Sequence, residues 1–228
     1  MLSLTPTPNN DIVIKVHYPE LAANVLPGQY VHFSRQEITQ NMIGYVLGTE
    51  AATNSVSLYV NADILSAPLS IDDLLWVSQA KGSALPLPEF SHRALLVADK
   101  WGLPSILFLS QLIAISKLQN KVVVLLSAEQ EFPFKPQPSR YLLPGMPAGV
   151  IAACPLLEDR KIPSRLICDA YLPGCYEGSA IEFLSEYSTD NTGCDDLTIH
   201  CAGNGQFVTS VNQWASARDI LHYSISLP

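Results

Sequence analysis

This sequence of 228 residues has little charge and, above all, few basic residues. Charged residues make up 15% of it, and 13 lysines and arginines stand against 21 aspartates and glutamates, which gives a formal net charge of -8. An acidic chain without a basic patch repels phosphate backbones, so nucleic acid is not an expected partner. The hydrophobic fraction of 48% is typical of a chain that buries a sizeable core.

Long apolar runs and targeting signals are also missing. The longest apolar stretch, Ser105–Ser116, is interrupted by Ser110 and Gln111 and is far too short to cross a bilayer. The N-terminal residues MLSLTPTPNND show no basic region followed by an apolar one, so no secretory signal is visible. We therefore expect a cytoplasmic protein without a membrane span.

Cysteine is too scarce and too irregularly spaced to form a framework. The count is odd and no pair has CxxC spacing, which excludes a disulfide scaffold, a zinc knuckle and an iron–sulfur loop. His200 and Cys201 are neighbours on an expected strand, so they point to opposite faces and are unsuited to sharing a metal. No metal site is expected. The five cysteines are Cys154, Cys168, Cys175, Cys194 and Cys201.

The first ninety residues have the pattern of β structure. Short β-branched or aromatic segments follow one another, separated by turn signals such as Pro27-Gly28. This spacing predicts a small antiparallel β-barrel over residues 1–90. The expected strands are Asp11–Val16, Gln29–Phe33, Gly44–Leu47, Ser55–Val60 and Leu74–Val77.

The pattern changes at the proline-rich segment Leu85–His92, which is the predicted domain boundary. Strands and helices alternate after it, which predicts an α/β domain with a parallel sheet over residues 91–228. The expected strands are Ala94–Ala98, Val122–Ser127, Gly149–Ala153, Leu166–Asp169, Leu197–Cys201 and Ile220–Leu227. The expected helices are Ser105–Leu118, Ser179–Glu186 and Phe207–Ala217, with Ser179 as the expected N-cap of the second.

The segment 94–113 contains the most informative pattern. An apolar strand, Ala94–Ala98, enters the short loop Asp99–Pro104, and a helix begins at about Ser105. A strand, a tight loop and a helix N-terminus in this order build the anion-binding corner of nucleotide-binding α/β sheets. Such corners are usually rich in glycine, whereas this loop contains only Gly102.

A barrel followed by an α/β domain resembles the ferredoxin–NADP reductase superfamily of flavoprotein reductases. The turn Pro27-Gly28-Gln29-Tyr30-Val31 is similar to the PGQ[FY]V motif of that family, and Tyr45 lies where its R-x-Y-[ST] strand is expected. The segment 98–106, ADKWGLPSI, resembles the Gly-rich loop of dihydroorotate dehydrogenase electron-transfer subunits. It looks closer still to the GDxTALPAI loop of siderophore-interacting reductases. His200-Cys201-Ala202-Gly203 resembles the late CGP or AGE corner.

The resemblance implies a flavin site with partly altered residues. Tyr45 would stack on the flavin ring, while Ile43 replaces the arginine that binds the diphosphate and Val46 replaces the hydroxyl residue. Isoleucine offers neither charge nor hydrogen-bond donors to a phosphate. Ser66 would stand at the second flavin-phosphate loop, which usually has a glycine; none occurs between Gly48 and Gly82. The alternative is that Tyr45 is simply an aromatic residue of the barrel.

The resemblance also implies a nicotinamide site at the two loops of the α/β domain. Its residues would be Asp99, Trp101, Gly102, Pro104 and Gly203. Cys201 would lie near the carbon that transfers hydride, as the candidate catalytic residue. The alternatives are an ordinary strand–helix turn, with Pro104 in the first helical turn, and a buried core cysteine.

Two functions follow from these observations. The first is a flavoprotein oxidoreductase that passes electrons from NAD(P)H through FAD to an unknown acceptor: a protein, a ferric chelate or a quinone. NADH is the expected dinucleotide because basic residues are scarce after Val122–Ser127, and no iron–sulfur cluster is expected. The second is a reductase-like protein that has lost its cofactors and serves as a binding or regulatory subunit.

Overall fold

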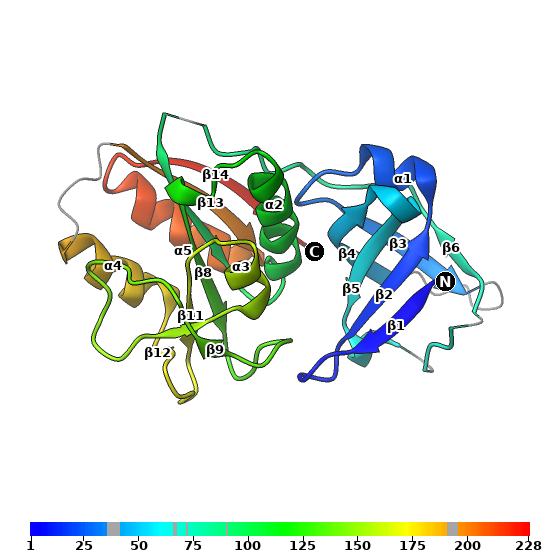
Figure 1. The fold of residues 1–228 in the computed structure, drawn as a ribbon, viewed down its shortest axis with the longest axis horizontal. Helices are drawn as coiled ribbons and strands as arrows, with labels where there is room; N and C mark the ends of the chain where they lie inside the picture. The colour runs from blue at the N-terminus through cyan, green and yellow to red at the C-terminus, as the bar shows by residue number, and fades with distance from the viewer. Residues whose placement is uncertain (36–41, 66–67, 72, 90, 191–195) are drawn as a thin grey trace.

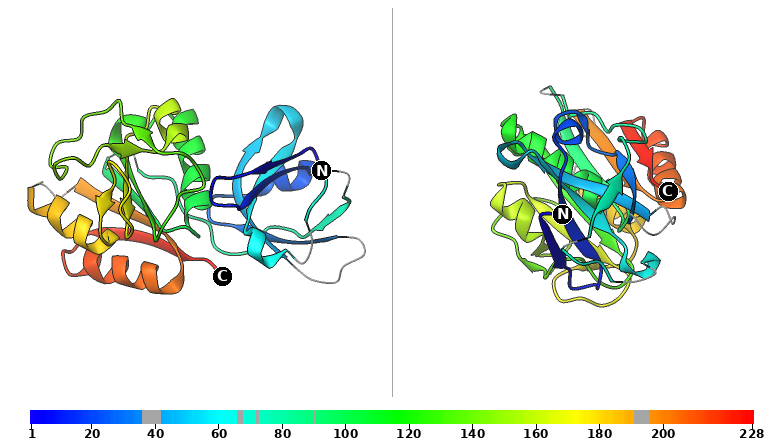
Figure 2. Two further views of the ribbon diagram at one scale, coloured as in Figure 1. Left: turned by 90° about the horizontal axis from the view of Figure 1, so that it is seen from below. Right: turned by 90° about the vertical axis from the view of Figure 1, so that its right-hand side faces the viewer.

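The computed structural model describes residues 1–35, 42–65, 68–71, 73–89, 91–190 and 196–228. They form two domains that lie side by side, each built on a six-stranded sheet (Figures 1 and 2). The first sheet is antiparallel and curled, with the strand order β1-β2-β5-β4-β3-β6. Its elements are β1 (Ser3–Pro6), β2 (Ile12–His17), α1 (Pro19–Asn24), β3 (Tyr30–Arg35), β4 (Met42–Glu50), η1 (Ala51–Thr53), β5 (Ser55–Val60), η2 (Ala62–Ile64) and β6 (Leu75–Val77).

The second sheet is parallel among its six strands, in the order β12-β11-β8-β7-β13-β14. Its strands are β7 (Arg93–Ala98), β8 (Val122–Ala128), β11 (Ser164–Cys168), β12 (Tyr176–Glu177), β13 (Leu197–Gly203) and β14 (Leu221–Ser226). The helices are α2 (Leu103–Ile115), η3 (Gln119–Lys121), α3 (Pro155–Asp159), α4 (Ala180–Asp190) and α5 (Gly205–Ser216). The predicted fold class, a β-barrel-like domain followed by a parallel α/β domain, is confirmed.

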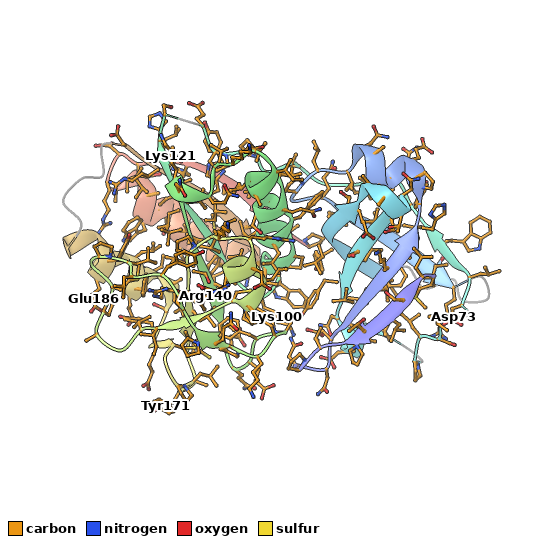
Figure 3. All side chains as sticks on the ribbon, viewed as in Figure 1. Asp73, Lys100, Lys121, Arg140, Tyr171 and Glu186 are labelled. Atoms are coloured by element: carbon orange, nitrogen blue, oxygen red, sulfur yellow. The ribbon has the colours of Figure 1, made fainter. Side chains whose placement is uncertain are left out.

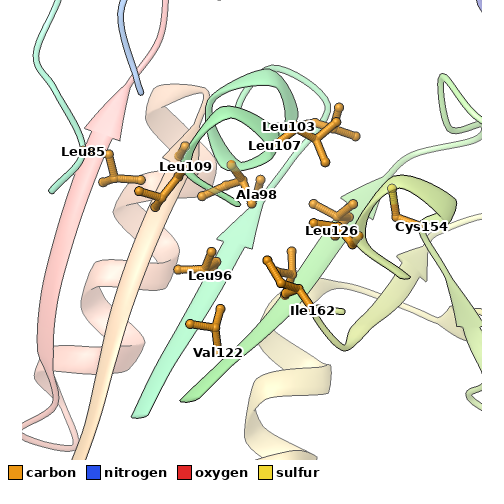
Figure 4. Close-up of a cluster of buried hydrophobic side chains, with 14 of the residues drawn as sticks. Leu85, Leu96, Ala98, Leu103, Leu107, Leu109, Val122, Leu126, Cys154 and Ile162 are labelled. Carbon is orange, nitrogen blue, oxygen red and sulfur yellow. The ribbon is translucent and has the colours of Figure 1, made fainter. Parts of the chain in front are cut away.

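The helices cover the parallel sheet on both faces because its strands are apolar on both sides. Leu96 and Ala98 of β7 pack with α2 and α3, as the close-up in Figure 4 shows. Leu95 and Val97 point the other way and pack with α4 and α5. The alternation of side chains along one strand therefore places each helix pair on its own face.

Capping residues fix where two of these helices begin. Before α4, the Ser179 hydroxyl accepts from the Glu182 backbone N–H at 3.3 Å, and the Glu182 carboxylate accepts from the Ser179 N–H at 2.7 Å. This reciprocal arrangement is a capping box. Before α5, the Asn204 side chain accepts from the Phe207 N–H at 2.9 Å. Ser179 is the N-cap that the sequence suggested.

The segment predicted as a strand at Gly149–Ala153 does not join the parallel sheet. Only Ala152–Ala153 is extended (β10), and it pairs antiparallel with β9 (Gln137–Pro138) in a separate two-stranded sheet. The backbone N–H groups of Ile151 and Ala152 both donate to the Gly174 carbonyl, so this segment is bonded to loops on both sides. The strand β1 had no predicted counterpart, and α2 begins two residues earlier than expected.

The described residues include no helix that has both the length and the apolar character needed to pass through a lipid bilayer.

Candidate coenzyme site between the two sheets

Helix α2 forms the contact between the two domains. Its Phe108 is 1% exposed and packs into the core of the antiparallel sheet. Its Gln111 donates to the Thr49 carbonyl at 2.6 Å and accepts from the Thr49 N–H at 3.3 Å. A Cβ at Gly48 would lie 2.6 Å from the Gln111 amide oxygen, so glycine makes room for this side chain. Helix α2 is therefore in direct contact with both domains, at the position where a coenzyme cleft is expected.

The loop between β7 and α2 is occupied by its own carboxylate. Asp99 is 8% exposed, and its Oδ1 accepts from the backbone N–H groups of Trp101 and Gly102, both at 2.9 Å. Its Oδ2 accepts from the Asn204 N–H at 2.8 Å. Three donors at two helix N-termini are thus used by one side chain, although such donors are what an incoming phosphate would need.

Two glycines allow these loops to meet. A Cβ at Gly102 would lie 1.9 Å from the Ala202 carbonyl oxygen, and a Cβ at Gly203 would lie 2.8 Å from the Asp99 carboxyl carbon. The ends of β7 and β13 are neighbours in the sheet, and any larger residue would push them apart. Pro104 is buried in the first turn of α2. The structure therefore brings together Asp99, Trp101, Gly102, Pro104 and Gly203, the residues that the resemblance assigned to a nicotinamide site.

Tyr45 and Trp101 close the space between the domains. Tyr45 lies on β4, is 4% exposed, and its ring centroid is 5.9 Å from that of Trp101, with the rings tilted by 51°. Its hydroxyl donates to the backbone carbonyl of the last residue, Pro228; Figure 1 shows this end of the chain between the two domains. Burial, with smaller contributions from Asp99 and Tyr30, raises the pKa of Tyr45 to about 12.

An ion pair adds a further link across the cleft. The Lys100 ammonium lies 3.3 Å from the Asp11 carboxylate of the antiparallel domain and 5.4 Å from the centroid of the Trp101 ring. Asp11 is 3% exposed and also accepts from the hydroxyl of Tyr59 and from Asn9. Figure 3 shows Lys100 on the side of the parallel-sheet domain that faces its neighbour.

Among the described residues, no arginine replaces the phosphate-binding arginine that the resemblance places at position 43. Ile43, the residue at that position, is half-buried and packs on the apolar core. Arg35, one strand away on β3, is paired with Asp73 at 3.2 Å and bonded to the Pro68 carbonyl. Ser66, the residue predicted for the second phosphate loop, lies outside the described residues.

Cys201 does not face the cleft. Its thiol is fully buried on the face of the sheet covered by α4 and α5, whereas Tyr45 packs on the other face. Burial, and secondarily the nearby Asp99 carboxylate, raises the pKa of the thiol. His200 points the opposite way, is buried against the Tyr223 ring, and has its pKa lowered by burial to about 4. The structure gives neither residue access to the cleft.

Gln111, Asp11 and Pro228 are among the residues of the site that were not predicted. Gln111 had a signal in the sequence, because it interrupts an otherwise apolar helix, and a polar residue there needs a partner. Asp11 and Pro228 had none, because their partners are 89 and 183 residues away in the chain, respectively.

Comparison with known proteins identifies the architecture. No model of a protein family matches the sequence, and no curated protein matches it. Solved structures do match over nearly the whole chain. One is an NADH-dependent reduced ferredoxin–NADP oxidoreductase, with a TM-score of 0.69 and 11% identity, covering 98% of this chain and 74% of that one. The chain has the ferredoxin reductase fold.

Two further reductases support this assignment. The ferredoxin reductase of carbazole 1,9a-dioxygenase has a TM-score of 0.71 and 11% identity, covering 99% of this chain and 67% of that one. A ferredoxin–NADP+ reductase from Neisseria gonorrhoeae with bound FAD and NADP has a TM-score of 0.65 and 14% identity, covering 96% and 93%. Identities this low establish a common fold, and the site must decide the function.

The residues of the cleft do not fit a flavin in this arrangement. A ring stacked between two aromatic faces needs about 3.5 Å on each side, hence about 7 Å between those faces. Tyr45 and Trp101 are 5.9 Å apart, centroid to centroid, and are tilted. The Tyr45 hydroxyl is bonded to the C-terminal backbone, and no charged group takes the role of the phosphate-binding arginine among the described residues around Ile43.

Proposed function

We propose that this chain is a ferredoxin reductase-fold protein that works without a bound redox coenzyme, as a binding or regulatory subunit. The observation that carries the proposal is the carboxylate of Asp99, which accepts hydrogen bonds from three backbone N–H groups at the two loops that would meet a dinucleotide. A phosphate entering there would have to displace a buried carboxylate of the same sign. A phosphate in contact with the Asp99 carboxylate would be repelled strongly, because the site is partly buried.

The closed contact between the domains supports the same conclusion. Tyr45, Trp101 and the C-terminal carbonyl fill the space, and the Lys100–Asp11 pair bridges it. Opening the cleft would expose the buried tyrosine and break these bonds at once. The arrangement stabilises two domains against each other, which suits a scaffold better than a site that must admit a coenzyme.

An exposed apolar surface on the far side of the antiparallel domain supports a binding role. Ile71, Leu74 and Trp76 are 52%, 69% and 67% exposed, and Trp76 lies on β6, an outer strand of its sheet. Exposed tryptophan with neighbouring aliphatic residues is typical of protein contact surfaces. The partner we propose is therefore another protein, docking on the antiparallel domain.

Flavin binding tests the proposal directly. The protein purified after expression with excess riboflavin is expected to be colourless, and titration with FAD and FMN is expected to leave the fluorescence of free flavin unchanged. Yellow protein, or saturable quenching of added flavin, would refute it.

A photo-crosslinking residue at position 74, compared with one at Leu142, which is 98% exposed, tests the partner surface. A discrete protein adduct in the host cell is expected from position 74 alone.

Electron transfer from NAD(P)H through FAD to a protein or ferric-chelate acceptor is the second candidate. It is favoured by the fold, since the similar Neisseria gonorrhoeae reductase binds FAD and NADP. The same titration separates the two candidates. If flavin binds, anaerobic bleaching by NADH decides whether the loop 99–104 is a working nicotinamide site.

A further inference from the structure

A cavity lies at the opposite end of the parallel sheet from Asp99. It has a volume of about 230 Å³ and opens where β7, β8 and β13 begin. Lys121, just before β8, and Lys100, just after β7, lie at opposite ends of this domain in Figure 3. The strands between them have six or seven residues, so the two regions are roughly 20 Å apart. The cavity is therefore independent of the coenzyme cleft and of the function proposed for it.

The floor of the cavity is apolar and has a fixed shape. Leu95, Leu143 and Trp214 contribute to it. The Trp214 ring is 7% exposed, its Nε1–H donates to the Ser185 hydroxyl at 3.0 Å, and the Arg218 guanidinium lies 4.4 Å from its ring centroid. A wall held on both sides is preorganised, so little ordering is required when a ligand binds.

The charged residues of the lining are all cationic. Arg93, Lys121 and Lys161 line the cavity, and no aspartate or glutamate is among its described lining residues. Arg93 and Lys121 have other partners within the protein. This is notable in a chain with a formal net charge of -8. An apolar floor below a group of cations is complementary to a molecule with a hydrophobic body and one negative charge.

The volume limits the size of that molecule. A cavity of about 150 Å³ holds one benzene molecule, and this one is about 230 Å³. It therefore accommodates a single ring with a short chain, or an acyl chain of comparable bulk. We propose that this cavity is a binding site for a small hydrophobic monocarboxylate, with its carboxylate near Lys161 and its apolar part against Trp214.

Calorimetric titration with 3-phenylpropanoate and octanoate, each compared with its neutral amide, tests this site. An exposed ion pair changes an affinity about two- to fivefold, so Lys161 should favour each acid over its amide by that factor. In an amide proton–nitrogen NMR spectrum, the indole signal of Trp214 should move on binding while that of Trp101 stays in place. Equal binding of acid and amide, or no saturable binding, would overturn the proposal.

A matched pair of variants locates the ligand. Leu143→Trp should fill the cavity and lower the affinity for the acids by more than tenfold. Leu142→Trp makes the same change at the adjacent residue, which is 98% exposed and does not line the cavity, so binding should be unchanged. Lys161→Gln should lower the affinity for the acid two- to fivefold and leave that for the amide unaltered. Equal loss in the two tryptophan variants, or no effect of Lys161→Gln, contradicts the assignment.

Discussion

Replacing Asp99 with alanine should destabilise the protein and convert the loop into an anion site. The substitution leaves three backbone N–H groups, those of Trp101, Gly102 and Asn204, without their acceptor. A buried donor left unpaired costs about 1–3 kcal/mol. Because water can enter the space left by the carboxylate, we expect the low end of that range for each donor, hence a total of about 3 kcal/mol. For a protein of this size the melting temperature should fall by about 6–12 °C.

A small carboxylate should restore part of this stability. In Asp99→Ala, formate can accept from the same three backbone N–H groups that the Asp99 side chain accepts from in the parent protein. With a dissociation constant of about 10 mM, about 100 mM formate would return about 1.4 kcal/mol. Thermal unfolding of both proteins with formate and with equal chloride measures the effect. If formate stabilises both proteins equally, or if the variant is as stable as the parent, the interpretation of this corner is wrong.

The same carboxylate should make stability depend on pH. Burial is the largest influence on Asp99, and the pKa of the carboxyl is raised from its ordinary value of 3.8 although three N–H groups oppose the shift. The folded state therefore holds this proton more tightly than the unfolded chain, so its contribution to stability is fully present below the unfolded pKa of 3.8 and is lost as pH rises through the raised pKa. As pH rises through the raised pKa, the free energy of unfolding of the parent should fall relative to that of Asp99→Asn. The opposite trend would mean that the hydrogen bonds outweigh burial.

Three further changes test the contacts around the cleft. Gly102→Ala places a Cβ 1.9 Å from a backbone oxygen and should cost about 3 kcal/mol in urea unfolding. Gln111→Leu removes both bonds to Thr49 and should cost about 2 kcal/mol in the same assay. Tyr45→Phe should remove one phenol that ionises at about pH 12 from the ultraviolet absorbance titration, and should lower stability by about 1 kcal/mol.

Each of these variants has a control that separates the effect of the altered contact from a general loss of folding. Gly205→Ala is the control for Gly102→Ala, because its nearest neighbour would be the Ser226 hydroxyl at an ordinary 3.5 Å, and it should change stability by less than about 1 kcal/mol. Gln111→Glu keeps an acceptor for the Thr49 N–H but places a second acceptor against the Thr49 carbonyl, so it should cost at least as much as Gln111→Leu. A tyrosine titration unchanged by Tyr45→Phe would show that another phenol ionises at that pH.

Local patterns in the sequence were sufficient to find most of the elements. The strand Ser55–Val60 was predicted with both its ends, because strand periodicity is short-range and turn residues flank it. Ser179 was found as a helix cap for the same reason. The Gly149–Ala153 strand was wrong because an apolar segment does not reveal which neighbour it pairs with, and here the partner is a loop strand at Gln137–Pro138.

Local sequence patterns likewise predicted one part of the candidate site and missed another. The loop 99–104 was identified from its position between an apolar strand and a helix, and that position is a local property. That Asp99 would turn inward and bond to Asn204, 105 residues later, depended on β7 and β13 becoming neighbours in the sheet. The prediction of a coenzyme cleft placed the right residues together without showing that they fill the space themselves.

What the sequence determined by itself was the succession of strands and helices, the turn at Pro27-Gly28 and the low charge, because each depends on residues close together in the chain. The tertiary structure alone decided that Gly28 would lie beside Ile225, where a Cβ would approach the isoleucine to 2.5 Å, and that Tyr45 would reach the C-terminal carbonyl. Such contacts join segments about 180 to 200 residues apart. They arise only when the two domains pack together, and no local pattern encodes them.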